Sequence, residues 1–191
     1  MKITVELNRK SIREAIKTIK SQRKVLAEQM IPEYMQKSAE WIKNRANEIL
    51  ESSDIGVKVV QNIASSWHID IISNSHLILY NMSWKAAYVE FGVGVVGQAE
   101  PHPNASQTNY EYNVDSPHKY SDGGWAFSVP DQSELDIPKD AIIQQDYSSV
   151  YDLTIYTQGT QGVWYLFNAV EDFKVREQQR LWEEIKKKYW S

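Results

Sequence analysis

The spacing of apolar residues changes twice along this 191-residue chain, and that change restricts the folds available to it. Near the N-terminus and after residue 162, apolar side chains recur every three or four positions, as in amphipathic helices. Between residues 57 and 157 the apolar runs are short and rich in β-branched and aromatic residues, which favours strands. Helices on both sides of a run of strands predict an α+β fold with a mostly antiparallel sheet.

Two helices are predicted in the N-terminal part of the chain. Ser11 and Glu14 have the spacing of a capping box, which predicts that the first helix starts there. Pro32 is expected to break this helix and to stand in the first turn of the second. The second helix is expected to end at Asp54 and Gly56, because both residues favour turns.

The rest of the chain is predicted to alternate between strands, a short helix and a long helix. A short middle helix is expected from Ser83 to Gly92. A long C-terminal helix is expected after Gly162, too long for one small sheet to cover. Strands are predicted at residues 2–7, 57–59, 67–72, 76–80, 110–114, 125–129 and 150–157.

Charge is segregated along the chain. Residues 1–50 hold 11 basic and 6 acidic side chains (net +5), and residues 51–173 hold 4 and 16 (net −12). Residues 174–191 hold 6 and 3 (net +3). Such asymmetry indicates a charged partner surface or a neighbouring copy of the chain, the alternative being solvated helix faces beside acidic loops.

We expect a single domain over residues 1–191, with a long acidic loop region rich in proline and glycine at about residues 97–149. Within it, residues 130–149 are expected to be the least ordered part of the chain, or to become ordered against a partner.

Composition excludes several classes of protein. The chain has no cysteine, which excludes a disulfide scaffold, a thiol nucleophile and cysteine-ligated zinc or iron–sulfur sites. No apolar run approaches the ~18 residues of a membrane span, and the first residues lack an apolar signal core. We therefore expect a protein that is neither secreted nor bound to a membrane.

The search for catalytic and ligand motifs gives no site. Gly92 to Gly97 match G-x-G-x-x-G, but the segment follows a predicted helix and runs into Pro101 and Pro103, so we expect a helix-capping glycine and a loop. The four histidines lack metal-ligand spacing, and no nucleophile elbow or phosphate loop occurs. We therefore expect that the protein is not an enzyme, has no catalytic residues and binds no cofactor or metal. A hydrolase using paired carboxylates is the distant alternative.

One face of the first predicted helix is basic. Arg13, Lys17, Lys20 and Lys24 follow one another at spacings of three and four residues. Such a face fits non-specific contact with DNA phosphates or a complementary acidic surface, the alternative being an ordinary solvated helix face.

The stretch Tyr88-Val-Glu-Phe-Gly-Val-Gly-Val-Val-Gly97, followed by Pro101-His102-Pro103, resembles the neck or tail-completion family of long-tailed bacteriophages. Family members show a Tyr-Val-Glu-Phe-Gly-Thr-Gly core, a His-Pro loop, an aromatic strand and a C-terminal helix. Softer matches lie at residues 112–114, 124–127 and 159–169. Val93 replaces the common threonine, and the usual prolines before the last helix are absent.

The resemblance implies a structural role and no catalysis. It implies a cyclic homo-oligomer, six-fold favoured and twelve-fold possible, around the DNA channel in the virion neck, where it joins the filled head to the tail. Implied neighbours are head-closure or connector proteins, tail-terminator or tail-tube proteins, and genomic DNA. Assembly is implied to occur in the host cytoplasm. A tail-terminator or head-closure ring is the alternative.

The predicted contacts between copies are residues of the motif at 88–97 and three tryptophans near or in the C-terminal helix. The glycines are expected to let a neighbouring backbone come close, and tryptophan is common among interface anchors. The predicted interface residues are Tyr88, Glu90, Phe91, Gly92, Gly94, Gly97, Trp164, Trp182 and Trp190.

Overall fold

A computed structural model describes residues 9–108, 110–112, 125–129, 142–144 and 153–190. The fold is mostly helical (69%), with long helical stretches over residues 9–51 and 165–190 and only small sheets. The predicted α+β fold with a mostly antiparallel sheet is therefore wrong. Most residues lie in the long helices at both ends of the chain, and the strands form only small sheets of two or three strands.

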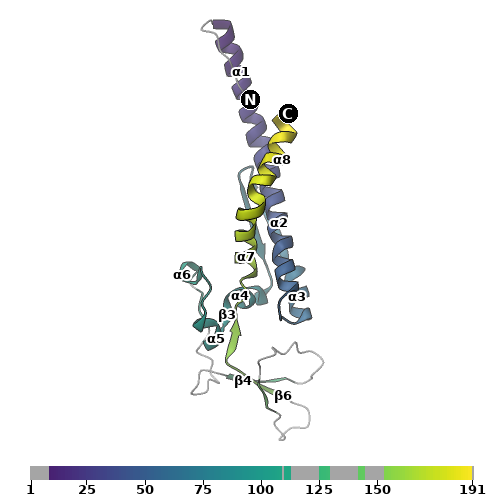
Figure 1. Cartoon of the computed structure of the whole chain (residues 1–191), viewed down its shortest axis with the longest axis vertical. Helices are drawn as coiled ribbons and strands as arrows, with labels where there is room; N and C mark the ends of the chain where they lie inside the picture. The colour runs from purple at the N-terminus through teal and green to yellow at the C-terminus, as the bar shows by residue number, and fades with distance from the viewer. Residues whose placement is uncertain (1–8, 109, 113–124, 130–141, 145–152, 191) are drawn as a thin grey trace. The chain divides into compact units, whose positions relative to one another are not determined.

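Figure 1 shows how the elements follow one another. The helices are α1 (Arg9–Val25), α2 (Ile31–Glu51), α3 (Val57–Ala64), α4 (Trp84–Phe91), α5 (Gly94–Ala99), α6 (Ala105–Thr108), α7 (Tyr165–Asp172) and α8 (Gln178–Trp190), with π-helical segments at Leu26–Met30 and Phe173–Glu177. The strands are β1 (Trp67–Ser73), β2 (His76–Asn81), β3 (Gly92–Val93), β4 (Trp125–Val129), β5 (Ile142–Gln144), β6 (Leu153–Thr157) and β7 (Gly159–Gln161). Strands β1 and β2 form one pair, β3 and β7 another, and β6 lies between β4 and β5.

Pro32 does not break the N-terminal helix. Val25 and Ile31, the residues that bound the π-helical segment Leu26–Met30, both have helical backbone angles, and the Ile31 N–H donates to the Leu26 carbonyl. Pro32 comes shortly after the π-helical segment and stands in the first turn of α2, as predicted. The helix therefore continues through the proline.

Two further predictions in this region are wrong. Helix α1 already includes Arg9, so Ser11 lies inside the helix and is not its cap. Residues 57–59, predicted as a strand, begin α3 instead. Val60 and Ile63 of α3 are buried at helical spacing, so tertiary burial overrides the strand preference of β-branched residues.

Most of the remaining element predictions are confirmed. Strands at 67–72, 76–80, 125–129 and 153–157 and the helix from Ser83 to Gly92 occur as expected. The long C-terminal helix also occurs, as α7, a π-helical segment and α8. Residues 110–112 are not a strand. Residues 2–7, 113–114 and 150–152, and residues 130–149 apart from β5, lie outside the described residues.

The chain divides into two compact units. Unit 1 takes residues 1–44, 68–80 and 170–191, and unit 2 takes residues 45–67 and 81–169. In unit 1 the C-terminal helix packs against the N-terminal helix (Figure 1) through a core of Met30, Phe173, Leu181 and Ile185. The apolar face of the long C-terminal helix is therefore covered by the N-terminal helix and not by a sheet.

Aromatic rings and ion pairs complete unit 1. The Trp41 and Phe173 rings have centroids 5.6 Å apart, and those of Tyr34 and Trp182 are 5.5 Å apart edge to face. Glu33 Oε2 accepts from Lys188 Nζ at 2.7 Å and from the Tyr189 hydroxyl at 2.8 Å. These contacts join α2 to the C-terminal helix at several points along its length.

Unit 2 has its own core. Polar side chains also tie its segments together, since Asn81 Nδ2 donates to the Ile63 carbonyl at 2.8 Å and Trp67 Nε1 donates to Asn47 Oδ1 at 2.8 Å. Its buried apolar residues are Ala46, Leu50, Val60, Ile63, Ala86, Val89, Tyr165 and Ala169.

Candidate functional site

The motif that carries the resemblance builds a buried junction inside unit 2. Glu90, on α4, is 7% exposed. Its Oε1 accepts from the Phe167 N–H at 2.9 Å, and its Oε2 accepts from the Leu166 N–H at 2.8 Å. These amides belong to the first turn of α7, whose donors have no partner within the helix. Glu90 therefore caps a helix 75 residues further along the chain.

His102 binds the same carboxylate. Its Nε2 lies 3.0 Å from Glu90 Oε1, and its side chain is 3% exposed. Its Nδ1 lies 3.0 Å from the Asn104 N–H and accepts from it. Because Nδ1 accepts, the neutral ring carries its proton on Nε2 and donates it to Glu90. Glu90 thus has three donors around one buried carboxylate.

Glycines let two backbone segments meet in the junction. Strand β3 pairs antiparallel with β7, with Gly92 opposite Gln161. Gly92 has φ +81° and Gly159 φ +105°, which is the left-handed region that favours glycine. A Cβ at Gly92 would lie 2.6 Å from the Thr160 carbonyl oxygen, and one at Gly159 would lie 1.9 Å from that of Val93. The close backbone is therefore the chain's own β7 segment.

Aromatic rings surround the Glu90–His102 pair. The Phe91 ring stacks on Tyr110 with centroids 4.5 Å apart and contacts His102 at 4.4 Å. The Tyr110 hydroxyl donates to the Gly92 carbonyl at 2.6 Å. Burial, then the nearby Tyr88 and Tyr112, raises the pKa of Tyr110 to about 12. Trp164, directly before α7, is the described non-glycine residue with positive φ, at +54°.

The carboxylate of Glu90 holds the start of α7. Both of its oxygens accept hydrogen bonds, Oε1 from two donors and Oε2 from one. Within the described residues, no group of three or more His, Asp or Glu side chains is placed to hold a metal. Glu90 and the glycines were predicted as interface residues from the sequence, but the pairing of Glu90 with His102 was not predicted. The Pro-His-Pro loop within the motif was the available signal.

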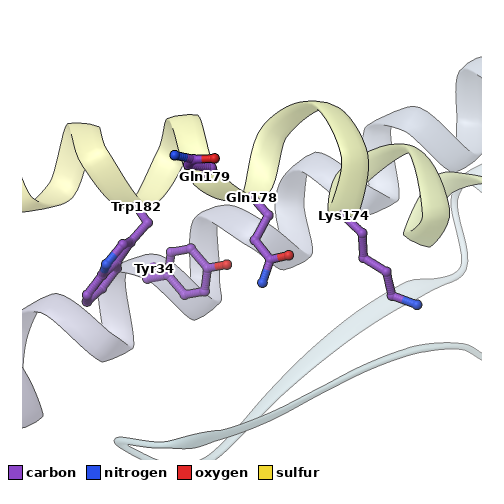
Figure 2. Close-up of a pocket in the computed structure, with 5 residues that line it drawn as sticks. All are labelled: Tyr34, Lys174, Gln178, Gln179 and Trp182. Carbon is purple, nitrogen blue, oxygen red and sulfur yellow. The ribbon is translucent and has the colours of Figure 1, made fainter.

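Unit 1 contains a shallow pocket of about 570 Å³. Figure 2 shows the Tyr34 and Trp182 rings together, with Gln178 beside them on the C-terminal helix. The other lining residues are Lys174 and Gln179. Lys174 is paired with Glu171 at 2.6 Å, so its charge is neutralised within the helix. Trp182, a predicted interface residue, is half-buried in this wall and packs against the unit 1 core.

Helix α1 differs from every other long helix described, because none of its residues is buried. Ile12, Ile16 and Ile19 share one face at spacings of four and three, and they are 41%, 47% and 54% exposed. The predicted basic residues Arg13, Lys17, Lys20 and Lys24 are exposed along the neighbouring face. We call Ile12, Ile16 and Ile19 the isoleucine stripe.

Unit 2 also exposes a large aromatic side chain. Trp84, the first residue of α4, is 71% exposed, and Met82 is 67% exposed. Tyr88, one turn further, is half-buried and meets the Trp84 ring edge to face at 5.8 Å. Trp84 was not among the residues predicted from the sequence to lie at an interface. We call Met82, Trp84 and Tyr88 the Trp84 patch.

The structure places the predicted interface residues in two groups. Glu90, Gly92, Gly94 and Gly97 are buried inside unit 2. The others are accessible, with Trp190 42% exposed. The half-buried residues are Tyr88, Phe91, Trp164 and Trp182. A contact between copies through any of them remains a prediction.

Comparison with protein families, with curated proteins and with solved structures found no match to this chain. Of the helices in the described part of the chain, none is both long and apolar enough to cross a bilayer.

Proposed function

We propose that this chain is a structural component of the head-to-tail connector of a bacteriophage, which assembles as a ring around the DNA channel and joins the filled head to the tail. The observation that carries the proposal is the junction. Residues 88–97, His102 and residues 163–168, which the resemblance picks out separately, meet around one buried carboxylate. The segments that carry the resemblance thus form one structural unit in this chain, and the connector role follows from the resemblance by analogy.

The isoleucine stripe supports an assembled state. A soluble monomer gains nothing from an uncovered apolar face on a helix with no buried residue, whereas an assembly covers it. Exposed Trp84 supports the same interpretation, since tryptophan is enriched at the centres of protein interfaces. We favour a six-fold ring, as the resemblance implies, with connector and tail proteins above and below.

Purified particles of the phage or induced prophage that encodes this chain test the proposal. We expect mass spectrometry to find the chain at a few to a dozen copies per particle, and a gold-labelled tag to mark the neck. Inactivating its gene should leave filled heads and separate tails, and supplying the chain in trans should restore joining. Normal, infective particles without the chain would contradict the connector role.

A further inference from the structure

We propose that His102 is an acid-sensitive switch: proton uptake on its Nδ1 releases the turn at residues 102–105, while its Nε2 keeps its bond to Glu90. One ring nitrogen lies 3.0 Å from the Glu90 carboxylate, and the other lies 3.0 Å from the Asn104 N–H. The side chain is 3% exposed, so these two partners take up the hydrogen-bonding capacity of the ring. The switch lies within unit 2 and does not depend on the connector role.

The neutral form of the ring closes the turn. A neutral imidazole has one N–H and one bare nitrogen, and here the bare nitrogen is Nδ1, which accepts from the Asn104 N–H. In the same turn the His102 carbonyl accepts from the Ala105 N–H at 2.9 Å. The His102 N–H donates to the Tyr112 hydroxyl at 3.0 Å. The ring therefore ties the start of α6 to the junction only while Nδ1 has no proton.

A second proton must go to Nδ1, because Nε2 already has one. The cation then has an N–H on both sides of the ring. Nε2 still donates to Glu90, now in a charge-assisted bond, whereas the Nδ1 proton faces the Asn104 N–H, and two donors cannot bind each other. Asn104 is half-buried and Pro103 is exposed, so water can reach Nδ1 once the turn opens.

The carboxylate side of the ring favours the proton. Glu90 is buried, and the cation would form an ion pair with it at the 3.0 Å that separates Nε2 from Oε1. The Leu166 and Phe167 amides donate to the same carboxylate and need no movement when His102 becomes charged. The two sides of the ring therefore respond differently: the cap of α7 persists and the turn before α6 opens.

Other titratable groups near the pair stay neutral in the relevant range. Within the described residues, Tyr112 faces His102 through its hydroxyl, Tyr165 lies near Glu90, and Tyr110 lies beside them. Burial raises the pKa of Tyr110 to about 12, and burial followed by the Glu90 charge raises that of Tyr165. Histidine is the side chain that ordinarily changes charge between pH 5 and 8. The uncharged rings that contact His102 are Phe91, Trp164 and Phe167.

Nuclear magnetic resonance of the full chain tests the switch. The ¹⁵N shifts of the histidine rings report which nitrogens carry protons, and hydrogen exchange reports each backbone amide. We expect His102 to have its proton on Nε2 at pH 8 and protons on both nitrogens at pH 5. The protection factor of the Asn104 amide should fall by at least ~tenfold between these values, because that amide loses its acceptor. The Leu166 and Phe167 amides should keep their protection.

Two variants separate the ring proton from other effects of acid. His102→Asn places an amide oxygen that accepts from the N–H two residues on, as in an Asx turn, and that has no proton to gain. Its Asn104 amide should keep the same protection at both pH values. His76→Asn is the matched control, because it replaces an exposed histidine on β2 and should leave the pH dependence at Asn104 unchanged.

Four results would overturn the inference. The first two are His102 ring shifts that do not change down to pH 5, and an Asn104 amide that stays protected beside a charged ring. The third is loss of protection at Leu166 and Phe167 together with Asn104, which would mean that acid opens the whole junction. The fourth is a His102→Asn variant with the pH dependence of the parent. If this variant does not fold, the parent and His76→Asn still give the first three readouts. The particle experiments test the connector role separately.

Discussion

Charged side chains are buried and bound in the Glu90 junction of unit 2, whereas those of helix α1 are exposed. In the junction one buried carboxylate receives three donors from two other segments, and glycines remove every Cβ that would keep the backbones apart. On α1 seven cations and three isoleucines are all accessible. The motif of residues 88–97 thus takes part in the fold of unit 2, whereas α1 leaves both its charged and its apolar side chains exposed.

The largest effect is expected at Gly159. Alanine there would adopt an unfavourable φ of +105° and place its Cβ 1.9 Å from the Val93 carbonyl oxygen. We expect Gly159→Ala to destabilise unit 2 by more than ~4 kcal/mol, measured by urea unfolding with hydrogen exchange resolved by residue. Gly56→Ser is the matched control. Gly56 caps α3 with an ordinary φ of −60°, where serine is favourable. Equal stability of the two variants would contradict the close approach of β3 and β7.

Next in size is the loss of the Glu90 carboxylate. Glu90→Ala leaves the Leu166 and Phe167 amides and the His102 ring without their acceptor in a buried site. Each unsatisfied donor costs about 1–3 kcal/mol, so we expect a loss of at least ~3 kcal/mol and much faster hydrogen exchange at those two amides. Glu111→Ala, at an exposed carboxylate, should change neither quantity. Unchanged exchange in Glu90→Ala would show that α7 starts without its cap.

A smaller, pH-dependent effect is expected at Glu33 in unit 1. The Lys188 hydrogen bond, with help from Tyr189 and Lys37 and against partial burial, lowers the pKa of Glu33 from 4.5 to about 2. Because the unfolded chain binds the proton more readily, this stabilisation is complete above pH 4.5 and is lost as the pH falls towards 2. Because the partner side chains Lys37 and Lys188 are exposed to solvent, the contribution of these ion pairs to the free energy of unfolding should be less than ~1 kcal/mol.

Glu33→Gln should remove this component. Thermal midpoints of the parent and the variant should therefore differ at pH 7 and converge near pH 2, in low-salt buffer. A difference that stays constant over that range would mean that the Glu33 charge does not hold α2 to α8.

The smallest effect on stability is expected on α1. The stripe variant, with Ile12→Gln, Ile16→Gln and Ile19→Gln, should change the unfolding free energy of the dilute monomer by about 0.5 kcal/mol or less, because surface positions contribute little. Ile185→Val, a fully buried isoleucine losing one methylene, should cost about 1 kcal/mol in the same assay. A stripe variant that loses as much as Ile185→Val would show that the chain itself covers α1.

Local pattern predicted the type of many elements. The strands from residues 67 and 76, the helix ending at Gly92 and the long C-terminal helix follow from short-range spacing and capping, and all are present. Two predictions from local pattern were wrong: a helix break at Pro32 and a strand at residues 57–59. A π turn before the proline and the burial of Val60 and Ile63 are effects of the surrounding helix and core, which a short window does not contain.

The role of the motif was the hardest part to predict. The glycines were expected to meet the backbone of a neighbouring copy, and in the structure they meet residues 159–162 of the same chain. Glu90 and His102 are 12 residues apart, whereas Glu90 and Phe167 are 77 apart. No spacing rule links groups so distant, so the sequence did not predict these contacts within the chain, and a contact of the motif with a neighbouring copy stays a prediction.

By itself, the sequence determined the helical and strand periods, the segregation of charge and the amphipathic character of α1, because these depend on neighbours within a few residues. Only the tertiary structure decided that Glu90 caps α7, that the motif glycines admit β7, and that the isoleucine stripe is exposed rather than packed against another described segment. Those outcomes depend on which distant segments meet, since burial and hydrogen-bond satisfaction are settled between segments and not within them.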